Sequence, residues 1–458
     1  MKIAVFISNR TTFPQEIVRS ALVEVRDALQ RNGLESALPP TPAVTCDAEG
    51  CAYAEWLKAN PCDGVLAVFP NFGDEGSCFT ALRDAGVPIL VQAYPDALDA
   101  LGPATRRDSF CGKISAVNLF RQAGVPCTCL APHTVDPKST AFDKNLQDFA
   151  VLCRVVNGMR HVRTGAIGAR CSPFKTVRFD ECTLERLGIT NEVFDLSDVF
   201  QRVRRLDRSS ELHQDTLDRL RRLAVWPEKS EVALERIAAL ATVLRSIVAE
   251  YRLDALALRC WMELEEEWKI SPCAALSLLN GLGIPANCEV DIVNALAMRI
   301  LSLAADAPST CLDWNNNYGD DEDCCILFHC GPTAPQLMSA CGTIVDHPMF
   351  ARVHGPGNGL GCNQGRMRPG RFTCAGGMTR EGRLRFFLDQ GEFLSQELPK
   401  EFFGCGGIAR FSGLQDKMLA LLHYGFPHHT AVAYGQFVPV LREAMERYLG
   451  YEVVSLKS

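Results

Sequence analysis

The stretch DGVLAVF, residues 63–69, is a continuous apolar run with the length and character of a strand that is buried on both faces. Two similar runs lie on either side of it, KIAVFIS at residues 2–8 and VPILVQA at residues 87–93. Residues 16–31 have the apolar spacing of an amphipathic helix. Strands and helices that alternate in this way predict an N-terminal α/β domain with a parallel sheet.

The rest of the chain divides into two further predicted domains. Residues 131–145 contain Pro, Thr, Ser and Lys without strong periodicity, which predicts a linker near the end of a first domain at residues 1–150. A second α/β unit, residues 151–308, starts with a predicted strand in HVRTGAIGA. Residues 309–458 are richer in Gly, Cys, Phe and Thr and have shorter predicted strands, so we expect a β-rich C-terminal domain.

Composition excludes several classes of function. The 458 residues include 47 Lys and Arg against 54 Asp and Glu, a net charge of −7, which argues against nonspecific binding to nucleic acid or anionic lipid. The sequence has neither an apolar run of about 18 residues nor a signal-peptide pattern, so we expect a cytoplasmic protein with no membrane contact. The 21 cysteines form no CxxC pair and are expected to be mostly buried, reduced thiols.

The loop Pro70–Gly76, which contains Asn71, follows the predicted strand at 63–69. Open α/β sheets bind ligands at the carboxyl ends of their strands, so the loop is a candidate for ligand contact. An ordinary polar loop between a strand and a helix is the alternative.

Carboxylates follow two apolar segments in the second half of the chain. Glu263 comes just after the predicted strand in LALRCWME, at a position typical of catalytic groups, or it is a surface residue of an acidic cluster. Glu289 and Asp291 in CEVD precede a predicted helix at 293–304. Burying two such carboxylates requires a positive partner such as a divalent cation, whereas capping of the helix would explain Asp291 alone.

Three histidines are candidate ligands. His329 ends the apolar run ILFH, and His428 and His429 enter a predicted strand, where adjacent side chains point to opposite faces. Imidazoles combined with carboxylates favour Mn²⁺, Mg²⁺ or Co²⁺ over a thiolate-bound metal.

Six segments together resemble the L-fucose isomerase and L-arabinose isomerase superfamily, in particular its fucose-isomerase-like branch, over most of the chain. They are DSFCG (108–112), GARCSPFKTVRF (168–179), LALRCWMELEE (256–266), CEVDIVNALAM (288–298), LFHCGPTA (327–334) and GFPHHTAV (425–432).

The resemblance implies two Rossmann-like α/β domains, a barrel-like third domain and Mn²⁺-dependent conversion of an aldose into a ketose. By position, Glu263, Asp291 and His429 are the expected metal ligands, with His329 as an additional one. The metal would stabilise an enediolate while Glu263 and Asp291 act as base and acid. Beside them, the expected substrate contacts include Trp261, Glu289 and His428.

Two further expectations concern substrate and assembly. Arg366, Arg368 and Arg371 form a cationic loop, which is either a solvent-facing hairpin or a site for an anionic aldose such as sulfoquinovose. Otherwise the substrate is a neutral sugar of the fucose or arabinose type. The resemblance implies a trimer or hexamer in which Asn71, Asp108 and Ser109 contact the substrate of a neighbouring subunit. A non-catalytic sugar-binding protein and another metal-dependent enzyme acting on a hydroxycarbonyl compound are the remaining alternatives.

Overall fold

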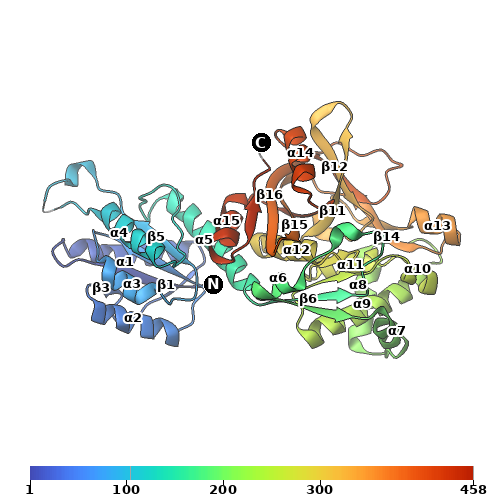
Figure 1. Ribbon diagram of the computed structural model, residues 1–458, viewed down its shortest axis with the longest axis horizontal. Helices are drawn as coiled ribbons and strands as arrows, with labels where there is room; N and C mark the ends of the chain where they lie inside the picture. Colours follow the sequence, from blue (N-terminus) through green and yellow to red (C-terminus); the bar gives the residue numbers. More distant parts are fainter. Residues whose placement is uncertain (104, 457–458) are drawn as a thin grey trace. The chain divides into compact units, whose positions relative to one another are not determined.

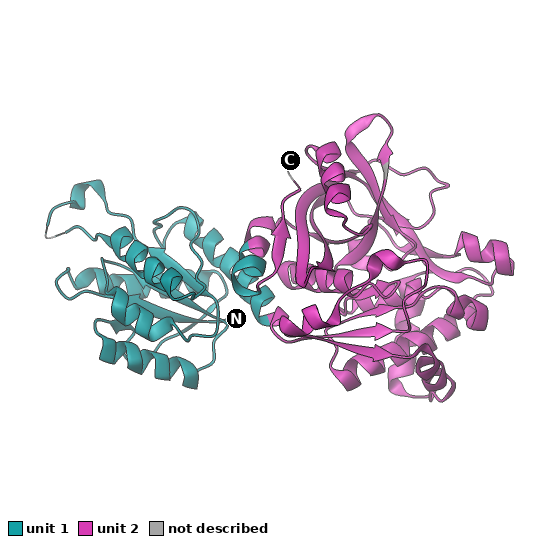
Figure 2. Ribbon diagram, in the orientation of Figure 1, with its two compact units in different colours: residues 1–157, 443–449 teal, residues 158–442, 450–458 magenta. Residues whose placement is uncertain are grey.

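A computed structural model describes residues 1–103 and 105–456, which form two compact units (Figures 1 and 2). Unit 1 contains residues 1–157 and 443–449. Unit 2 contains residues 158–442 and the segment from residue 450 on. Each unit is described by itself below.

Unit 1 is built on a parallel sheet with the strand order β2-β1-β4-β5, in which β3 also pairs with β1. The apolar run at residues 63–69 forms β4, all six residues of which are buried, and the predicted helix at residues 16–31 is α1. The strands are β1 (Lys2–Ser8), β2 (Glu35–Ala37), β3 (Ala43–Val44), β4 (Gly64–Phe69) and β5 (Ile89–Ala93). The helices are α1 (Glu16–Arg31), α2 (Asp47–Ala59), α3 (Glu75–Leu82), α4 (Ser109–Gln122) and α5 (Thr140–Met159), with a 3-10 turn at Leu98–Ala100.

The predicted linker at residues 131–145 is wrong in its second part, because α5 begins at Thr140. Phe142, Leu146, Phe149 and Cys153 are fully buried and recur at a spacing of three to four residues. Such an apolar stripe stabilises a helix by packing, despite the polar residues between its members.

Unit 2 begins with a second parallel sheet, in the strand order β10-β9-β6-β7. Its strands are β6 (Val162–Ile167), β7 (Ile189–Phe194), β9 (Ala255–Leu258) and β10 (Ala286–Cys288). The helices of this part are α6 (Glu181–Arg186), α7 (Leu196–Arg204), α8 (Glu211–Leu223), α9 (Glu231–Tyr251), α10 (Glu263–Trp268), α11 (Cys273–Gly281) and α12 (Ile292–Ala305), with a 3-10 turn at Lys175–Val177.

The remaining strands of unit 2 form a ten-stranded sheet, part of which closes into a ring. β16, β15, β18, β11, β12 and β17 pair in that order, and β17 pairs back to β16. The strands of the large sheet are β8 (Ala224–Val225), β11 (Thr310–Tyr318), β12 (Asp321–His329), β13 (Gly342–Asp346), β14 (Leu360–Arg366), β15 (Gly370–Arg380), β16 (Arg383–Phe393), β17 (Cys405–Arg410), β18 (His429–Tyr434) and β19 (Glu452–Val454). The other helices of unit 2 are α13 (Pro348–His354), α14 (Leu414–Tyr424) and α15 (Val438–Glu443), with a 3-10 turn at Pro335–Leu337. The π-helix Ala444–Tyr448, which follows α15, belongs to unit 1.

The predicted class is confirmed at the level of mixed α/β structure with parallel sheets and a large β-rich sheet. Helix α12 contacts strands of both sheets of unit 2, and its first residues follow β10 directly. Of the 21 cysteines, all of which are free, most are buried. Among the described residues, no helix is both long enough and apolar enough to span a membrane.

The close packing of α4 against the loop after β4 gives a test of unit 1. A Cβ atom at Gly112 would lie 1.6 Å from the carbonyl oxygen of Phe72, so we expect Gly112→Ala to destabilise unit 1 by about 1–3 kcal/mol, the usual cost of overpacking. Gly76→Ala is the matched control, because a Cβ atom there meets only ordinary contacts at 3.5 Å or more. Thermal unfolding followed by circular dichroism should show a lower midpoint for the Gly112 variant alone. Equal midpoints for the two variants would contradict this packing.

Candidate metal and sugar site

Two acidic residues follow β10 through an unusual backbone turn. Glu289 and Val290 both have left-handed conformations, with φ of 61° and 62°, and Asp291 then caps the N-terminus of α12 by accepting the N–H of Asn294 at 3.0 Å. The left-handed region is unfavourable for a β-branched residue such as Val290, and residues held in this region cluster at functional sites. The turn leaves Glu289 and Asp291 both buried.

Strand pairing brings a third carboxylate to the same place. Asp313 of β11 lies directly opposite His429, the first residue of β18, in an antiparallel ladder. Directly opposed residues project from the same face of a sheet, so the carboxylate and the imidazole are neighbours. Asp313 is a site residue that the sequence analysis did not identify.

Two carboxylates approach the same imidazole nitrogen. Nε2 of His429 lies 3.6 Å from Oε2 of Glu289 and 3.7 Å from Oδ1 of Asp313. All three atoms are buried and have no hydrogen-bond partner among the described residues. These separations exceed a hydrogen bond, but they match the range of about 3.0–4.2 Å between ligands that each bind one cation at about 2.1 Å.

Asp291 fixes the orientation of the imidazole. Nδ1–H of His429 donates to Oδ2 of Asp291 at 2.8 Å, which leaves Nε2 facing Glu289 and Asp313. A carboxylate that holds the far nitrogen of a histidine is the usual support of a metal-bound imidazole. Both oxygens of Asp291 are therefore occupied, one by His429 and the other by the cap of α12.

The protonation of the site is abnormal. Burial raises the pKa of Glu289 to about 7 and that of Asp313 to about 6. Burial disfavours the charged form of His429, but its hydrogen bond to Asp291 and the nearby carboxylates raise its pKa to about 9. Without a cation the carboxyl groups thus tend to retain protons, and a bound divalent cation would favour their ionised forms.

His428 lies beside the same group. Its Nε2 is 3.8 Å from Oε2 of Glu289 and 3.7 Å from Oδ1 of Asp313, and burial lowers its pKa to about 4. The expectation that His428 and His429 point to opposite faces is wrong, because His428 precedes β18 and does not alternate with its residues.

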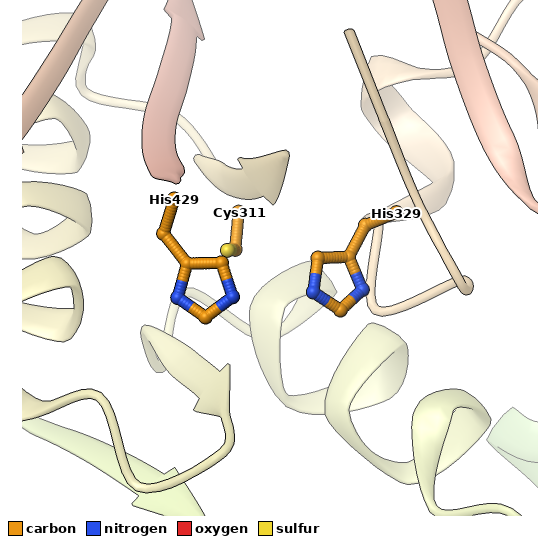
Figure 3. A group of neighbouring side chains, drawn as sticks. All are labelled: Cys311, His329 and His429. Atoms are coloured by element: carbon orange, nitrogen blue, oxygen red, sulfur yellow. The ribbon is translucent and has the colours of Figure 1, made fainter. Parts of the chain in front are cut away.

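His329, at the end of β12, is the third predicted histidine near this group. Its ring centroid is 5.6 Å from that of His429, and ligand atoms of Cys311, His329 and His429 all lie within 4.8 Å of one another (Figure 3). A second such group contains Glu289, His428 and His429. Burial lowers the pKa of His329 well below its usual value, so its imidazole is neutral.

Glu263 has a different partner. Its carboxylate forms a two-point ion pair with Arg259, four residues earlier. Glu265, two residues later, is the buried carboxylate of this segment, and burial raises its pKa to about 8.

Trp261 belongs to an aromatic cluster. Its ring centroid lies 5.5 Å from that of Phe174, 5.3 Å from that of Phe350 and 6.0 Å from that of His347. His347 in turn contacts the thiol of Cys330, the neighbour of His329, at 3.4 Å. Aromatic faces of this kind suit the apolar C–H surface of a sugar.

The predicted site residues of unit 1 lie on its loops. Asn71 is buried, donates to Asn9 at 2.9 Å and accepts the N–H of Gly73. Asp108 has a left-handed backbone just before α4 and pairs with Arg106. The hydroxyl of Ser109 is buried without a partner among the described residues. The contacts of Asn71 and Asp108 order the segments that precede α3 and α4, and Ser109 is the first residue of α4.

The two predicted anion-binding arginines contact the protein itself. Arg366 donates to the carbonyl groups of Gly365, Pro399 and Phe402. Arg368 is exposed and lies over the ring of Tyr434, 4.5 Å from its centroid.

Comparison with known proteins identifies relatives along the whole chain. Residues 4–160 match the family described as fucose/sulfoquinovose isomerase, N-terminal domain, and residues 327–457 match L-fucose isomerase, C-terminal domain. The sulfoquinovose isomerase of Priestia aryabhattai is 24% identical over 95% of each chain. That of Alkalicoccus urumqiensis is 23% identical over 98% of each chain.

Similarity to solved structures is weak. A periplasmic solute-binding protein from Actinobacillus succinogenes with bound D-allose is 10% identical, with a TM-score of 0.19 over 67% of this chain and 92% of that chain. This score is too low to support an inference. The two family matches and the full-length relatives agree, and the chain therefore belongs to the fucose-isomerase-like superfamily, as its sequence motifs predicted.

Proposed function

We propose that the protein is a divalent-metal-dependent aldose–ketose isomerase and that its substrate is a sulfonated aldose of the sulfoquinovose type. The observation on which the proposal rests is the approach of two buried, unpartnered carboxylate oxygens, Oε2 of Glu289 and Oδ1 of Asp313, to the unpartnered Nε2 of His429. Leaving three such atoms unpaired is unfavourable unless a ligand satisfies them. The relatives named sulfoquinovose isomerase support the choice of substrate.

Glu289, Asp313 and His429 are the residues that would hold the cation. Two carboxylates and one imidazole suit Mn²⁺, with Mg²⁺ or Co²⁺ as substitutes. When bound, the cation would supply a Lewis acid that polarises the oxygens on C1 and C2 of the sugar. This ligand set replaces Glu263 and Asp291 of the sequence analysis by Glu289 and Asp313, since Glu263 is paired with Arg259 and Asp291 with His429.

Isomerisation requires a carboxylate that moves a proton between two carbons. Removing the proton from C2 gives an enediolate, and returning it to C1, with the proton of the C2 hydroxyl passing to the oxygen on C1, gives the ketose. We assign this transfer to Oε1 of Glu289, since Oε2 is the oxygen that faces His429 and the proposed cation. Asp291 has no free oxygen for this step and acts by positioning His429.

The surrounding residues would bind and shield the sugar. The cluster of Trp261, Phe174 and Phe350 offers aromatic faces for the C–H groups of the sugar, and His428 offers a neutral imidazole beside Glu289. Recognition of the sulfonate by Arg368, and contributions of Asn71, Asp108 and Ser109 within a trimer or hexamer, are part of the proposal.

The function is tested by following aldose and ketose signals in the NMR spectrum with Mn²⁺ present. We expect interconversion of sulfoquinovose and its 2-ketose, no turnover after chelation of the metal, and recovery when Mn²⁺ is restored. Turnover of L-fucose or L-arabinose in its place would support a neutral-sugar isomerase. Saturable sugar binding without turnover would identify a binding protein and contradict the proposal.

Substitutions distinguish the proposed metal ligands Glu289 and Asp313 from Glu263. We expect Glu289→Gln and Asp313→Asn each to weaken Mn²⁺ binding by at least about 100-fold and to abolish turnover, because each removes a buried anionic ligand. Glu263→Gln is the matched control, and it should retain wild-type Mn²⁺ affinity since its carboxylate pairs with Arg259. Free Mn²⁺ measured by electron paramagnetic resonance gives the affinity. Loss of Mn²⁺ binding in the Glu263 variant, with binding intact in the other two, would restore the original assignment.

A further inference from the structure

The two buried histidines that face each other across the site have different hydrogen bonds at Nδ1. Nδ1 of His429 contacts a carboxylate of Asp291, which can only accept, so this nitrogen carries the proton. Nδ1 of His329 lies 2.9 Å from the backbone N–H of Cys330, which can only donate. Nδ1 of His329 is therefore the acceptor, and in the neutral ring the proton resides on Nε2.

The Nε2 atoms of the two rings therefore have different hydrogen-bonding roles in the site. Nε2 of His429 offers a lone pair to the cation when metal binding displaces its proton, whereas Nε2 of His329 carries an N–H. Figure 3 shows the two rings facing each other, with Cys311 beside His429. Nε2 of His329 is buried and has no partner among the described residues.

A buried N–H without a partner requires an acceptor, and a cation cannot supply one. For His329 to bind a metal, the proton would have to move to Nδ1, where it would oppose the N–H of Cys330. The same argument weakens a softer metal site formed by Cys311, His329 and His429, although the ligand atoms of these residues are close together. The complementary ligand is an oxygen atom of the bound sugar.

We propose that His329 is a neutral hydrogen-bond donor to the oxygen on C1 or C2 of the substrate and is not a metal ligand. The proposal rests on the isomerase function proposed above and adds a residue that touches the reacting atoms. Negative charge grows on the C1 oxygen as the C2 proton leaves, so a donor fixed in its tautomer stabilises the transition state more than the bound aldose. The N–H of Cys330 is the contact that fixes the tautomer.

The test compares His329→Leu, which removes the donor, with His329→Gln, whose amide retains an N–H. The Gln variant also guards against loss of folding, which circular dichroism would detect. Cys311→Ser is the matched control, because it alters a buried side chain within 4.8 Å of both rings without removing a proposed contact. Three quantities are measured in each variant: Mn²⁺ affinity, the affinity of the Mn²⁺-loaded protein for the unreactive open-chain hexitol D-glucitol, and kcat.

We expect both His329 variants to bind Mn²⁺ within about threefold of wild type, since no ligand is lost. The Leu variant should lose about 100-fold in kcat and bind D-glucitol more weakly, and the Gln variant should recover part of both. Weakening of Mn²⁺ binding by about 30-fold or more in both variants would make His329 a ligand and overturn the proposal. Unchanged D-glucitol binding in the Leu variant would overturn it as well. If the wild-type protein isomerised no aldose, the proposed function would fail, and the Mn²⁺ and D-glucitol measurements would still decide the role of His329.

Discussion

The hydrogen bond from Nδ1 of His429 to Asp291 is the contact on which the rest of the site depends. It joins the beginning of α12 to the beginning of β18, residues 138 positions apart in the chain, at 2.8 Å. Because Asp291 also caps α12, the helix that contacts both sheets of unit 2 is tied to the imidazole. Without this bond, the tautomer and orientation of His429 would not be fixed.

Burial controls the protonation of the site. Glu289 and Asp313 are held where their ionised forms are poorly solvated, which raises their pKa values, and the carboxylates around His429 raise the pKa of its imidazole. A protein that had no use for a cation would gain stability from apolar residues at these positions. The different hydrogen bonds at Nδ1 of His429 and His329 give the two rings different proposed roles. His429 would bind the cation, and His329 would donate a hydrogen bond to the sugar.

Local sequence signals predicted much of the fold, because buried parallel strands and amphipathic helices have short-range patterns. The run at 63–69 became β4, and the helix at 16–31 was correct to the residue. The linker prediction was wrong in its second part, because the Thr, Ser and Lys residues near the start of α5 obscure the spacing of its apolar residues. For the site, the segments containing Glu289, Asp291, His428, His429 and His329 were all identified.

Two assignments required three-dimensional information. A single Asp in an apolar strand resembles any half-buried strand residue, and only the pairing of β11 with β18 places Asp313 opposite His429. Glu263 does follow the end of β9, as its motif indicated, but Arg259, in the segment between β9 and α10, pairs with it. Which of several carboxylates faces a site depends on such competing partners, and composition and spacing do not determine it.

Titration of Mn²⁺ into the metal-free protein at several pH values tests the central claim most directly. Metal binding must displace protons from Glu289, with a pKa near 7, from Asp313, with a pKa near 6, and from Nε2 of His429. The account predicts one Mn²⁺ ion per chain, with an affinity that rises from pH 5.5 to pH 8 as these groups lose protons more readily. An affinity that does not change with pH, or that is the same in Asp313→Asn, would show that the cation binds elsewhere.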